Sequence, residues 1–198
     1  EAGVGKAEVA KGLAKVLDTP LIRLQCYEGL DASSTLYEWN YVRQILQIRL
    51  AEADASRREG LEDSIFGEAF LFDRPLLQAI RHSGPRPAVL LIDEIDRADE
   101  EFEAFLLEIL SDFQVTIPEL GTFTAEKPPC VILTSNRARE LNDALKRRCL
   151  SLWIDYPSPE KEREIILRRV PGIEADLARA VATVMGGLRT VDFYKRPG

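Results

Sequence analysis

The sequence predicts an α/β fold in which a doubly wound sheet of parallel strands is followed by a smaller helical part. Segments typical of strands and of helices alternate along most of the chain. Two apolar runs, Ala88–Ile92 and Val131–Leu133, lack polar alternation, as strands covered on both faces of a parallel sheet do. After Pro157 the pattern is wholly helical. We therefore expect an α/β domain over 1–156 and part of a helical domain over 157–198.

The first half of the chain is expected to contain two short elements and two long helices. Apolar residues at helical spacing predict a helix over Ala7–Leu17, and a short strand follows over Pro20–Leu24. Longer helices are expected from about Ser34 to Ala55 and from about Gly67 to His82, because a polar break separates two helical patterns.

The second half is expected to alternate strands with one helix and a hairpin before it becomes helical. The hairpin should turn at or near Gly121. In chain order the expected elements are a strand at Ala88–Ile92, a helix at Asp99–Phe113, the hairpin at Val115–Lys127, strands at Val131–Leu133 and Leu150–Ile154, and helices at Glu160–Arg169 and from Ile173 to about Met185.

The composition is that of a globular protein. Of 198 residues, 45% are hydrophobic and 30% are charged, which fits neither a disordered nor a fibrous chain. No apolar run approaches the roughly 18 residues that a membrane-spanning helix needs. With 26 basic and 33 acidic residues, the formal net charge is −7, so anionic nucleic acid is not the expected partner.

The cysteines do not suggest a metal site. Cys26, Cys130 and Cys149 lie far apart, none belongs to a CxxC pair, and His82 is the only histidine. A zinc site would need four grouped ligands. Cys130 lies in an apolar run and is interpreted as a small buried hydrophobic residue. Cysteines of this kind are typical of the reducing cytosol, which is the compartment we expect.

Glycines and a lysine near the N-terminus match the end of the phosphate-binding loop G-x-x-x-x-G-K-[ST]. Gly5 and Lys6 supply the Gly-Lys pair, and the first glycine would fall one position before residue 1. Backbone N–H groups of such a loop surround phosphate oxygens, and the lysine reaches the β- and γ-phosphates. The alternative is a glycine turn before a helix that happens to contain lysine. The residues expected to bind nucleotide are Gly3, Val4, Gly5, Lys6, Ala7 and Glu8.

Two acidic residues follow the strand at Ala88–Ile92. Because parallel strands deliver their last residues to the carboxyl edge of a sheet, where ligands of open α/β sheets bind, Asp93 and Glu94 are candidates for that site. Asp93 can hold Mg²⁺, usually through water, and Glu94 can polarise an attacking water molecule. The alternative is a strand followed by a solvated acidic turn.

Further polar residues follow the run at Val131–Leu133 and precede the expected strand at Leu150–Ile154. Asn136 could orient a water molecule against the γ-phosphate, although Asn is also common in turns and helix caps. Arg147 and Arg148 could reach the nucleotide of a neighbouring subunit as an arginine finger. The alternative is that both arginines lie on a solvated face.

Taken in this order, these features resemble the AAA+ superfamily of P-loop ATPases. Within it, the sequence is similar to the MoxR family, particularly its CoxD-like branch, and the resemblance covers essentially the whole chain. The segments that carry it are Cys26–Asp31, Leu91–Arg97, Phe113–Pro118, Thr134–Arg137 and Ala144–Cys149.

The resemblance implies a three-layer AAA+ sandwich whose parallel sheet lacks its first, central strand, followed by the start of a helical lid. In the AAA+ strand order the missing strand lies between the last strand and the sensor strand. We therefore expect Leu21–Gln25, Ala88–Ile92 and Val131–Thr134 to be parallel neighbours, and Leu150–Ile154 to be set apart from them.

The resemblance also implies roles for the candidate residues. Lys6 would be the Walker A lysine, Asp93 and Glu94 the Walker B acids, and Asn136 sensor 1. The cofactors would be ATP and Mg²⁺.

Two further cationic roles follow from the same resemblance. The arginine finger would be Arg148, with Arg147 as the second choice. A sensor 2 cation should lie in the lid, where Lys195 and Arg196 are the nearest candidates.

The family forms hexameric rings that act as chaperones in metalloenzyme maturation, often with a von Willebrand factor A-type partner. The resemblance therefore implies a homo-oligomeric ring and a client protein, with no membrane contact. The helix around Tyr37, Trp39 and Tyr41 would belong to the family's extra insertion, and these aromatic residues are interpreted as core rather than a surface that grips substrate.

The sequence departs from the P-loop pattern at Ala7, where the motif has a Ser or Thr whose hydroxyl binds Mg²⁺. Three hypotheses follow. The chain belongs to an ATPase that remodels a client protein, to a nucleotide-binding scaffold that does not hydrolyse ATP, or to a DNA-acting motor. The acidic charge disfavours the third.

Overall fold

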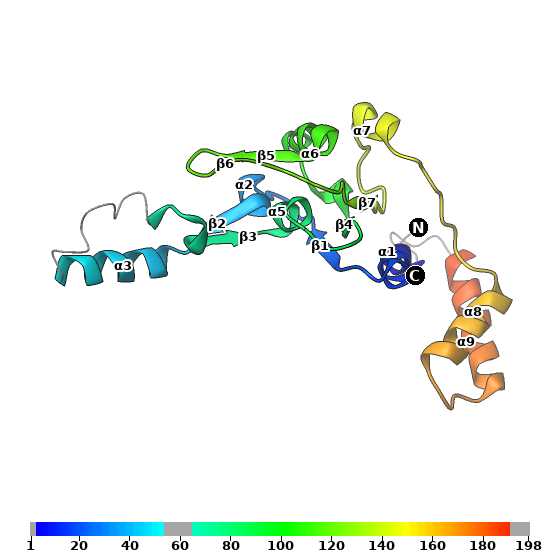
Figure 1. Cartoon of the computed structure of the whole chain (residues 1–198). Helices are drawn as coiled ribbons and strands as arrows, with labels where there is room; N and C mark the ends of the chain where they lie inside the picture. Colours follow the sequence, from blue (N-terminus) through cyan, green and yellow to red (C-terminus); the bar gives the residue numbers. More distant parts are fainter. Residues whose placement is uncertain (1–2, 54–64, 191–198) are drawn as a thin grey trace. The chain divides into compact units, whose positions relative to one another are not determined.

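The computed structural model describes residues 3–53 and 65–190, which belong to two compact units. The larger unit spans Ala7–Cys149, and the other comprises residues 3–6 and 150–190 (Figure 1). The domain boundary expected near Pro157 stays a prediction.

Three parallel strands form the centre of the larger unit. They are β1 (Leu21–Gln25), β4 (Val89–Asp93) and β7 (Cys130–Leu133), in the order β1-β4-β7. Every residue of β4 is buried, as its continuous apolar run predicted. The expectation that these segments are parallel neighbours is therefore confirmed.

Helices cover both faces of this sheet. Alanines of α1 (Lys6–Leu17) pack against Val89 and Leu91 on one face. On the other face, α5 (Pro75–Ile80) and α6 (Glu100–Asp112) join alternate residues of β4 in the main hydrophobic core. The two apolar faces of β4 thus each have a partner layer, which explains why the strand shows no polar alternation.

The expected third strand at Leu150–Ile154 is absent. The described residues of this segment have no strand conformation, and Leu150 is fully exposed while Leu152 is 80% exposed. A segment forms a strand only where a neighbouring strand satisfies its N–H and C=O groups.

The helix expected from Ser34 to Ala55 is interrupted. The structure has α2 (Ser33–Leu36), β2 (Tyr37–Trp39) and then α3 (Tyr41–Ala53). At Tyr37 the backbone is extended, with φ −154° and ψ 169°, because this aromatic segment pairs with a distant strand.

The helix expected from Gly67 to His82 is also wrong over its first half. Here η2 (Glu68–Phe70) leads into β3 (Leu71–Asp73), which pairs antiparallel with β2. Pro75 disfavours helical geometry at the residue before it, and Arg74 is accordingly extended, with φ −89° and ψ 171°. The helix therefore begins at Pro75 as α5.

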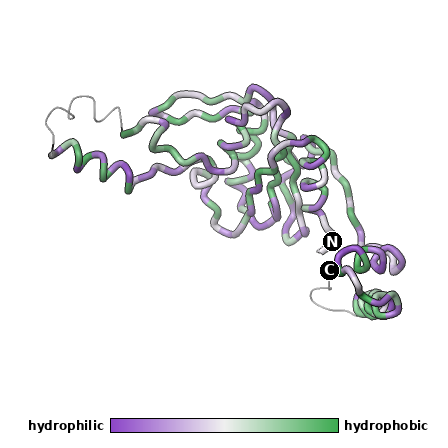
Figure 2. Tube along the Cα trace, turned by 60° about the horizontal axis from the view of Figure 1, so that its bottom comes forward, coloured by the Kyte–Doolittle hydropathy of each residue, from purple (hydrophilic) through white to green (hydrophobic). Residues whose placement is uncertain are grey.

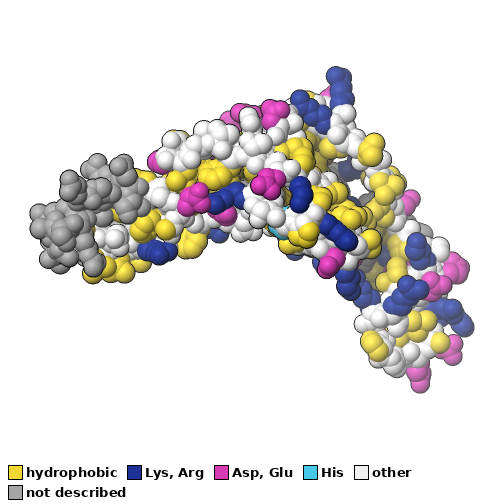
Figure 3. All heavy atoms as spheres, viewed as in Figure 1, with side chains coloured by type: hydrophobic (Ala, Val, Ile, Leu, Met, Phe, Trp, Pro, Cys, Tyr) yellow, Lys and Arg dark blue, Asp and Glu magenta, His cyan; other side chains and the backbone are white. Residues whose placement is uncertain are grey.

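The aromatic residues of this region divide between core and surface. Trp39 is 9% exposed and meets the Tyr37 ring edge to face at a centroid distance of 6.0 Å, which agrees with the core interpretation. Tyr41 is 62% exposed, so the core interpretation is wrong for it. It belongs to an apolar face of α3 that lies at the surface, formed by Tyr41, Val42, Ile45, Leu46 and Leu50 (Figure 3). Figure 2 shows hydrophobic and hydrophilic residues alternating along this helix.

The helix and the hairpin expected after β4 are both present in that order. Asp99 caps α6 by accepting a hydrogen bond from the Phe102 N–H at 2.8 Å. The hairpin consists of β5 (Gln114–Ile117) and β6 (Gly121–Thr124). Gly121 has φ +87° at its turn, a conformation that favours glycine. Helices η3 (Ile95–Arg97) and α7 (Asp143–Arg148) complete the unit.

The smaller unit contains α8 (Pro159–Arg169) and α9 (Ala175–Thr190), as the helical pattern predicted. Arg189 joins them through two hydrogen bonds to the Glu162 carboxylate, at 2.8 and 2.7 Å, and stacks 4.5 Å from the Tyr156 ring centroid. The sensor 2 candidates Lys195 and Arg196 lie outside the described residues.

Within residues 3–53 and 65–190, no helix is long and apolar enough to cross a membrane. In the same residues, no group of three or more His, Cys, Asp or Glu side chains could hold a metal ion. Cys130 is half-buried rather than fully buried, because it lies at the start of the edge strand β7.

Candidate functional site at the carboxyl edge of the sheet

Polar side chains gather where β4 and β7 end. Asp93 is the last residue of β4 and is 8% exposed, and Thr134 directly follows β7 and is 4% exposed. The Thr134 hydroxyl donates a hydrogen bond to Oδ1 of Asp93 and accepts one from the Glu94 N–H at 3.0 Å. One hydroxyl therefore fixes both acidic residues at the sheet edge.

Glu94 leaves the strand in the left-handed region, with φ 56° and ψ 48°. This conformation is uncommon for a residue other than glycine and is concentrated at functional sites. Its carboxylate accepts hydrogen bonds from Asn136 Nδ2 at 3.3 Å, Gln25 Nε2 at 3.1 Å and Arg97 Nη1 at 3.2 Å. The structure thus brings together Asp93, Glu94 and Asn136, as the sequence suggested.

Sequence reasoning missed two residues of this group. Arg23 Nη2 donates to Oδ2 of Asp93 at 2.5 Å and to Gln25 Oε1 at 2.6 Å. Both residues lie on β1, two positions apart, and side chains at that spacing share one face of a strand. That alternation of polar residues beside Leu24 was the available signal.

The segment that carries Asn136 is held in place by a buried carboxylate. Asp96 is 3% exposed and accepts hydrogen bonds from the N–H groups of Asn136 at 3.1 Å and Ala138 at 2.7 Å. Hydrogen bonds to a charged group are among the stronger ones in proteins. Asp96 therefore sets the position of Asn136 relative to Glu94.

Replacing Asp96 with Asn is expected to lower the free energy of unfolding by about 2–4 kcal/mol, because the amide cannot accept both N–H groups. Urea unfolding followed by circular dichroism measures the change. The exposed Glu101, on the first turn of α6, provides the control, and Glu101→Gln should change stability by less than about 0.5 kcal/mol. Equal effects of the two substitutions would contradict this role for Asp96.

A second buried carboxylate, that of Glu103, anchors the segment between Asn136 and α7. Glu103 is fully buried, forms an ion pair with Arg139, and accepts the Asn142 N–H at 2.7 Å. Arg139 also donates through Nε to the Ala98 carbonyl at 2.9 Å. The link from Asn136 to α7 is therefore anchored on both η3 and α6.

The paired arginines lie at the end of α7, away from Glu94. Arg148 Nη1 donates to the Leu107 carbonyl at 3.0 Å and to Ser111 Oγ at 2.8 Å, both on α6. Arg147 is exposed. The structure does not bring either arginine to the Asp93–Glu94 group within the larger unit.

The glycine segment has the backbone expected of an anion-binding loop. Gly3 and Gly5 have φ of +76° and +84°, and alternating backbone handedness of this kind points N–H groups to one side. Lys6 opens α1.

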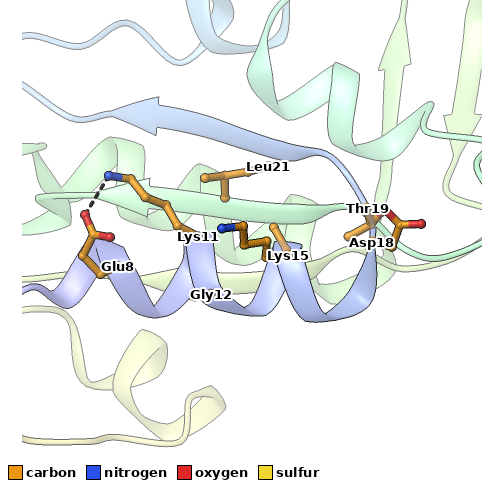
Figure 4. Close-up of a pocket in the computed structure, with 8 residues that line it drawn as sticks. Glu8, Lys11, Gly12, Lys15, Asp18, Thr19 and Leu21 are labelled. Carbon is orange, nitrogen blue, oxygen red and sulfur yellow. Dashed lines mark hydrogen bonds and ion pairs between the residues drawn. The ribbon is translucent and has the colours of Figure 1, made fainter. Parts of the chain in front are cut away.

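Helix α1 runs antiparallel to the strands it covers. Its C-terminal end lies at the start of β4, where Thr19 Oγ1 donates to the Pro87 carbonyl at 3.0 Å. In Figure 4 the arrow of β1, the strand that carries Leu21, points toward the end of α1 that carries Glu8, and β4 runs parallel to β1. Ala7 therefore lies toward the carboxyl edge of the sheet, the edge that holds Asp93.

An open depression beside α1 is separate from this group of side chains. It is lined on α1 by Glu8, Lys11 and Lys15 and at its far end by Thr19 and Leu21 (Figure 4). An ion pair of 2.8 Å joins Lys11 to Glu8. Of the residues expected to bind nucleotide, this depression includes Glu8 alone.

The oxygen-rich edge fits Mg²⁺ better than a soft metal. Mg²⁺ prefers oxygen ligands and usually keeps several waters, so one or two carboxylates suffice. Burial, together with the charges of Asp93, Asp96 and Glu94, raises the pKa of the neighbouring Cys26 thiol to about 12, which disfavours its thiolate form. Ala7 has no hydroxyl to contribute.

Comparisons with known proteins agree with this architecture. The family model of the AAA domain of the dynein-related subfamily matches residues 1–149. Uncharacterised proteins of Staphylococcus aureus strains bovine RF122, USA300 and NCTC 8325 are each 29% identical over 161 residues, 78% of this chain and 52% of the relative. The chain thus spans about half the length of these curated relatives.

The structure is also similar to the crystal structure of a proposed ATPase from Cytophaga hutchinsonii. The TM-score is 0.58 at 18% identity, and the match covers 94% of this chain and 52% of the other. At that identity the likeness shows a shared fold.

Proposed function

Because the chain belongs to the AAA domains of the dynein-related subfamily, we propose that it binds ATP with Mg²⁺ and hydrolyses it to remodel a client protein. It has the fold of a P-loop NTPase and is an AAA-family ATPase domain. The proposal that the chain hydrolyses ATP rests on one observation, the contact between the Glu94 carboxylate and the Asn136 amide beside Asp93. These three groups supply a base, a water-orienting amide and a metal ligand at one edge.

In this proposal Glu94 accepts the proton of the attacking water molecule, and Asn136 holds Glu94 and that water in line. Asp93 would hold the Mg²⁺ ion through water, and the ion supplies charge stabilisation for the transferred phosphoryl group. Gly3, Val4, Gly5 and Lys6 would bind the phosphates, with Ala7 and Glu8 beginning the helix behind them.

Assignment of the chain to the MoxR family, within the AAA+ ATPases, is based on the segments that resemble that family. That resemblance supports a homo-oligomeric, hexameric ring that acts as a chaperone in metalloenzyme maturation with a von Willebrand factor A-type partner. The test is to purify the full-length protein and measure Mg²⁺-dependent ATP hydrolysis and its mass in solution with and without ATP. An ATP-dependent ring whose hydrolysis rate responds to a client supports the proposal, whereas a monomer under all conditions would refute the ring.

A non-hydrolysing scaffold is the second candidate, and Ala7 is the observation that favours it. A third, a DNA-acting motor, is disfavoured by the net charge of −7. A DNA-binding assay over a series of salt concentrations separates it from the others, because phosphate contacts give steep salt dependence.

Replacing Ala7 with Thr is expected to raise kcat more than it tightens ATP affinity. The missing hydroxyl is a direct Mg²⁺ ligand in P-loop sites, whereas the loop amides and Lys6 bind the phosphates. Without it, water can fill the coordination position, so binding persists and hydrolysis is slow.

Steady-state ATPase rates at saturating Mg²⁺, compared with equilibrium ATP binding, test this expectation for Ala7. Ala7→Ser carries a smaller hydroxyl and should act in the same direction, while Ala7→Val, which matches Thr in shape, should not raise kcat. Equal kcat values for the unmodified protein and Ala7→Thr would show that the metal shell does not depend on this hydroxyl.

A further inference from the structure

Arg23 forms an ion pair with the carboxylate of Asp93, the group that would hold the metal ion. Its guanidinium lies 2.5 Å from Oδ2 of Asp93, while Thr134 takes Oδ1. Both oxygens of the Asp93 carboxylate are therefore engaged by groups of the protein. A guanidinium and a hydrated dication are alternative ways to neutralise one carboxylate.

The two side chains meet because of the strand register. Gln25 on β1 lies opposite Asp93 on β4, and Arg23 lies two residues earlier on the same face of β1. Gln25 accepts from Arg23 at 2.6 Å and donates to Glu94 at 3.1 Å. A chain of hydrogen bonds thus connects the Arg23 guanidinium, which pairs with Asp93, through Gln25 to the carboxylate of Glu94.

The exposure of the two side chains allows Arg23 to separate from Asp93. Its side chain is 55% exposed, whereas that of Asp93 is 12% exposed. A partly exposed guanidinium loses little on returning to water, so an ion pair of this kind contributes modestly. The buried carboxylate, by contrast, needs a positive partner whenever it is ionised.

We propose that Arg23 is a positioning residue that holds Asp93 in the metal-free site and competes with Mg²⁺ for it. This inference rests on the proposed function, since it concerns metal binding at the ATP site. Arg23 would release Asp93 when Mg²⁺·ATP binds, and it would then no longer belong to the chain of hydrogen bonds that reaches Glu94. Because Ala7 offers no hydroxyl, the metal depends more on Asp93, and the competition from Arg23 has a larger effect.

The test measures affinity rather than turnover. A fluorescent ATP analogue is titrated into the full-length protein with excess Mg²⁺ and, separately, with EDTA. The ratio of the two affinities reports the metal's contribution. Arg23→Gln is expected to raise that ratio by about three- to fivefold, the upper range for a partly exposed pair.

Arg97→Gln provides a matched control. Arg97 is 53% exposed and pairs with Glu94 at 3.2 Å, so its removal takes the same charge from the same edge without freeing Asp93. Its ratio should change by less than about twofold. Arg23→Lys keeps the charge but loses the forked geometry, and its ratio should lie between those of wild type and Arg23→Gln.

Circular dichroism melting first confirms that each variant is folded. If Arg23→Gln does not fold, the test relies on Arg23→Lys. The proposal is then overturned if the ratio of ATP affinities with Mg²⁺ and with EDTA is no higher for Arg23→Lys than for wild type. An unchanged or lowered ratio for Arg23→Gln also overturns it, as does weaker ATP binding in EDTA, which would mean that Arg23 contacts phosphate. If the unmodified protein binds no ATP, the proposed function itself has failed instead.

Discussion

Replacing Glu94 with Gln is expected to lower the ATPase rate of the full-length protein by about 10²- to 10⁴-fold, the usual contribution of general base catalysis. The amide keeps the shape of the side chain and can still bond to Asn136 and Gln25, whose present hydrogen bonds to Glu94 are 3.3 and 3.1 Å. It cannot take a proton from water. ATP binding should therefore persist while turnover is lost.

Single-turnover hydrolysis of radiolabelled ATP, together with equilibrium binding, separates the two effects for Glu94→Gln. Glu140→Gln is the control, since Glu140 is 89% exposed and pairs with Lys146 at the surface. Its rate should stay within about twofold of wild type. A Glu94→Gln rate close to wild type would remove Glu94 as the base and would favour the solvated-turn interpretation of this acidic pair.

Removing the arginine finger is expected to slow hydrolysis by about 10³- to 10⁵-fold. We propose Arg148 for this role, with Arg147 as the second choice. The hydrogen bonds that Arg148 makes to α6 use Nη1. They fix the guanidinium at the end of α7, outside the Asp93–Glu94 group of its own chain. Such a residue would act on the nucleotide of a neighbouring subunit.

Mixing variants tests this action in trans. Arg148→Ala and Glu94→Gln subunits are each expected to be inactive alone. In a mixed ring, some interfaces combine an intact Glu94 with an intact Arg148, and partial turnover should return. Parallel mixtures with Arg147→Ala tell the two arginines apart. If the Arg148→Ala mixture stays inactive although both proteins assemble, Arg148 does not act across the subunit boundary.

Much of the site could be predicted because parallel strands bring their carboxyl ends to one edge. Asp93, Glu94 and Asn136 each follow an apolar run, so the sequence alone indicated that they would meet. Arg23 could not be predicted in the same way. Its contact with Asp93 depends on the register of β1 against β4, and register is decided by pairing between segments far apart in the chain.

The sequence by itself determined the elements whose signals are local. The all-apolar strand β4 and the helix expected over Asp99–Phe113 both appear in the structure, because burial of a continuous run and helical periodicity are local signals. Tertiary structure alone decided that Tyr37–Trp39 forms a strand and that Leu150–Ile154 does not. Each outcome depends on whether a partner strand lies alongside to accept and donate hydrogen bonds. Tyr37–Trp39 has such a partner in Leu71–Asp73, whereas the described residues of Leu150–Ile154 have no strand conformation.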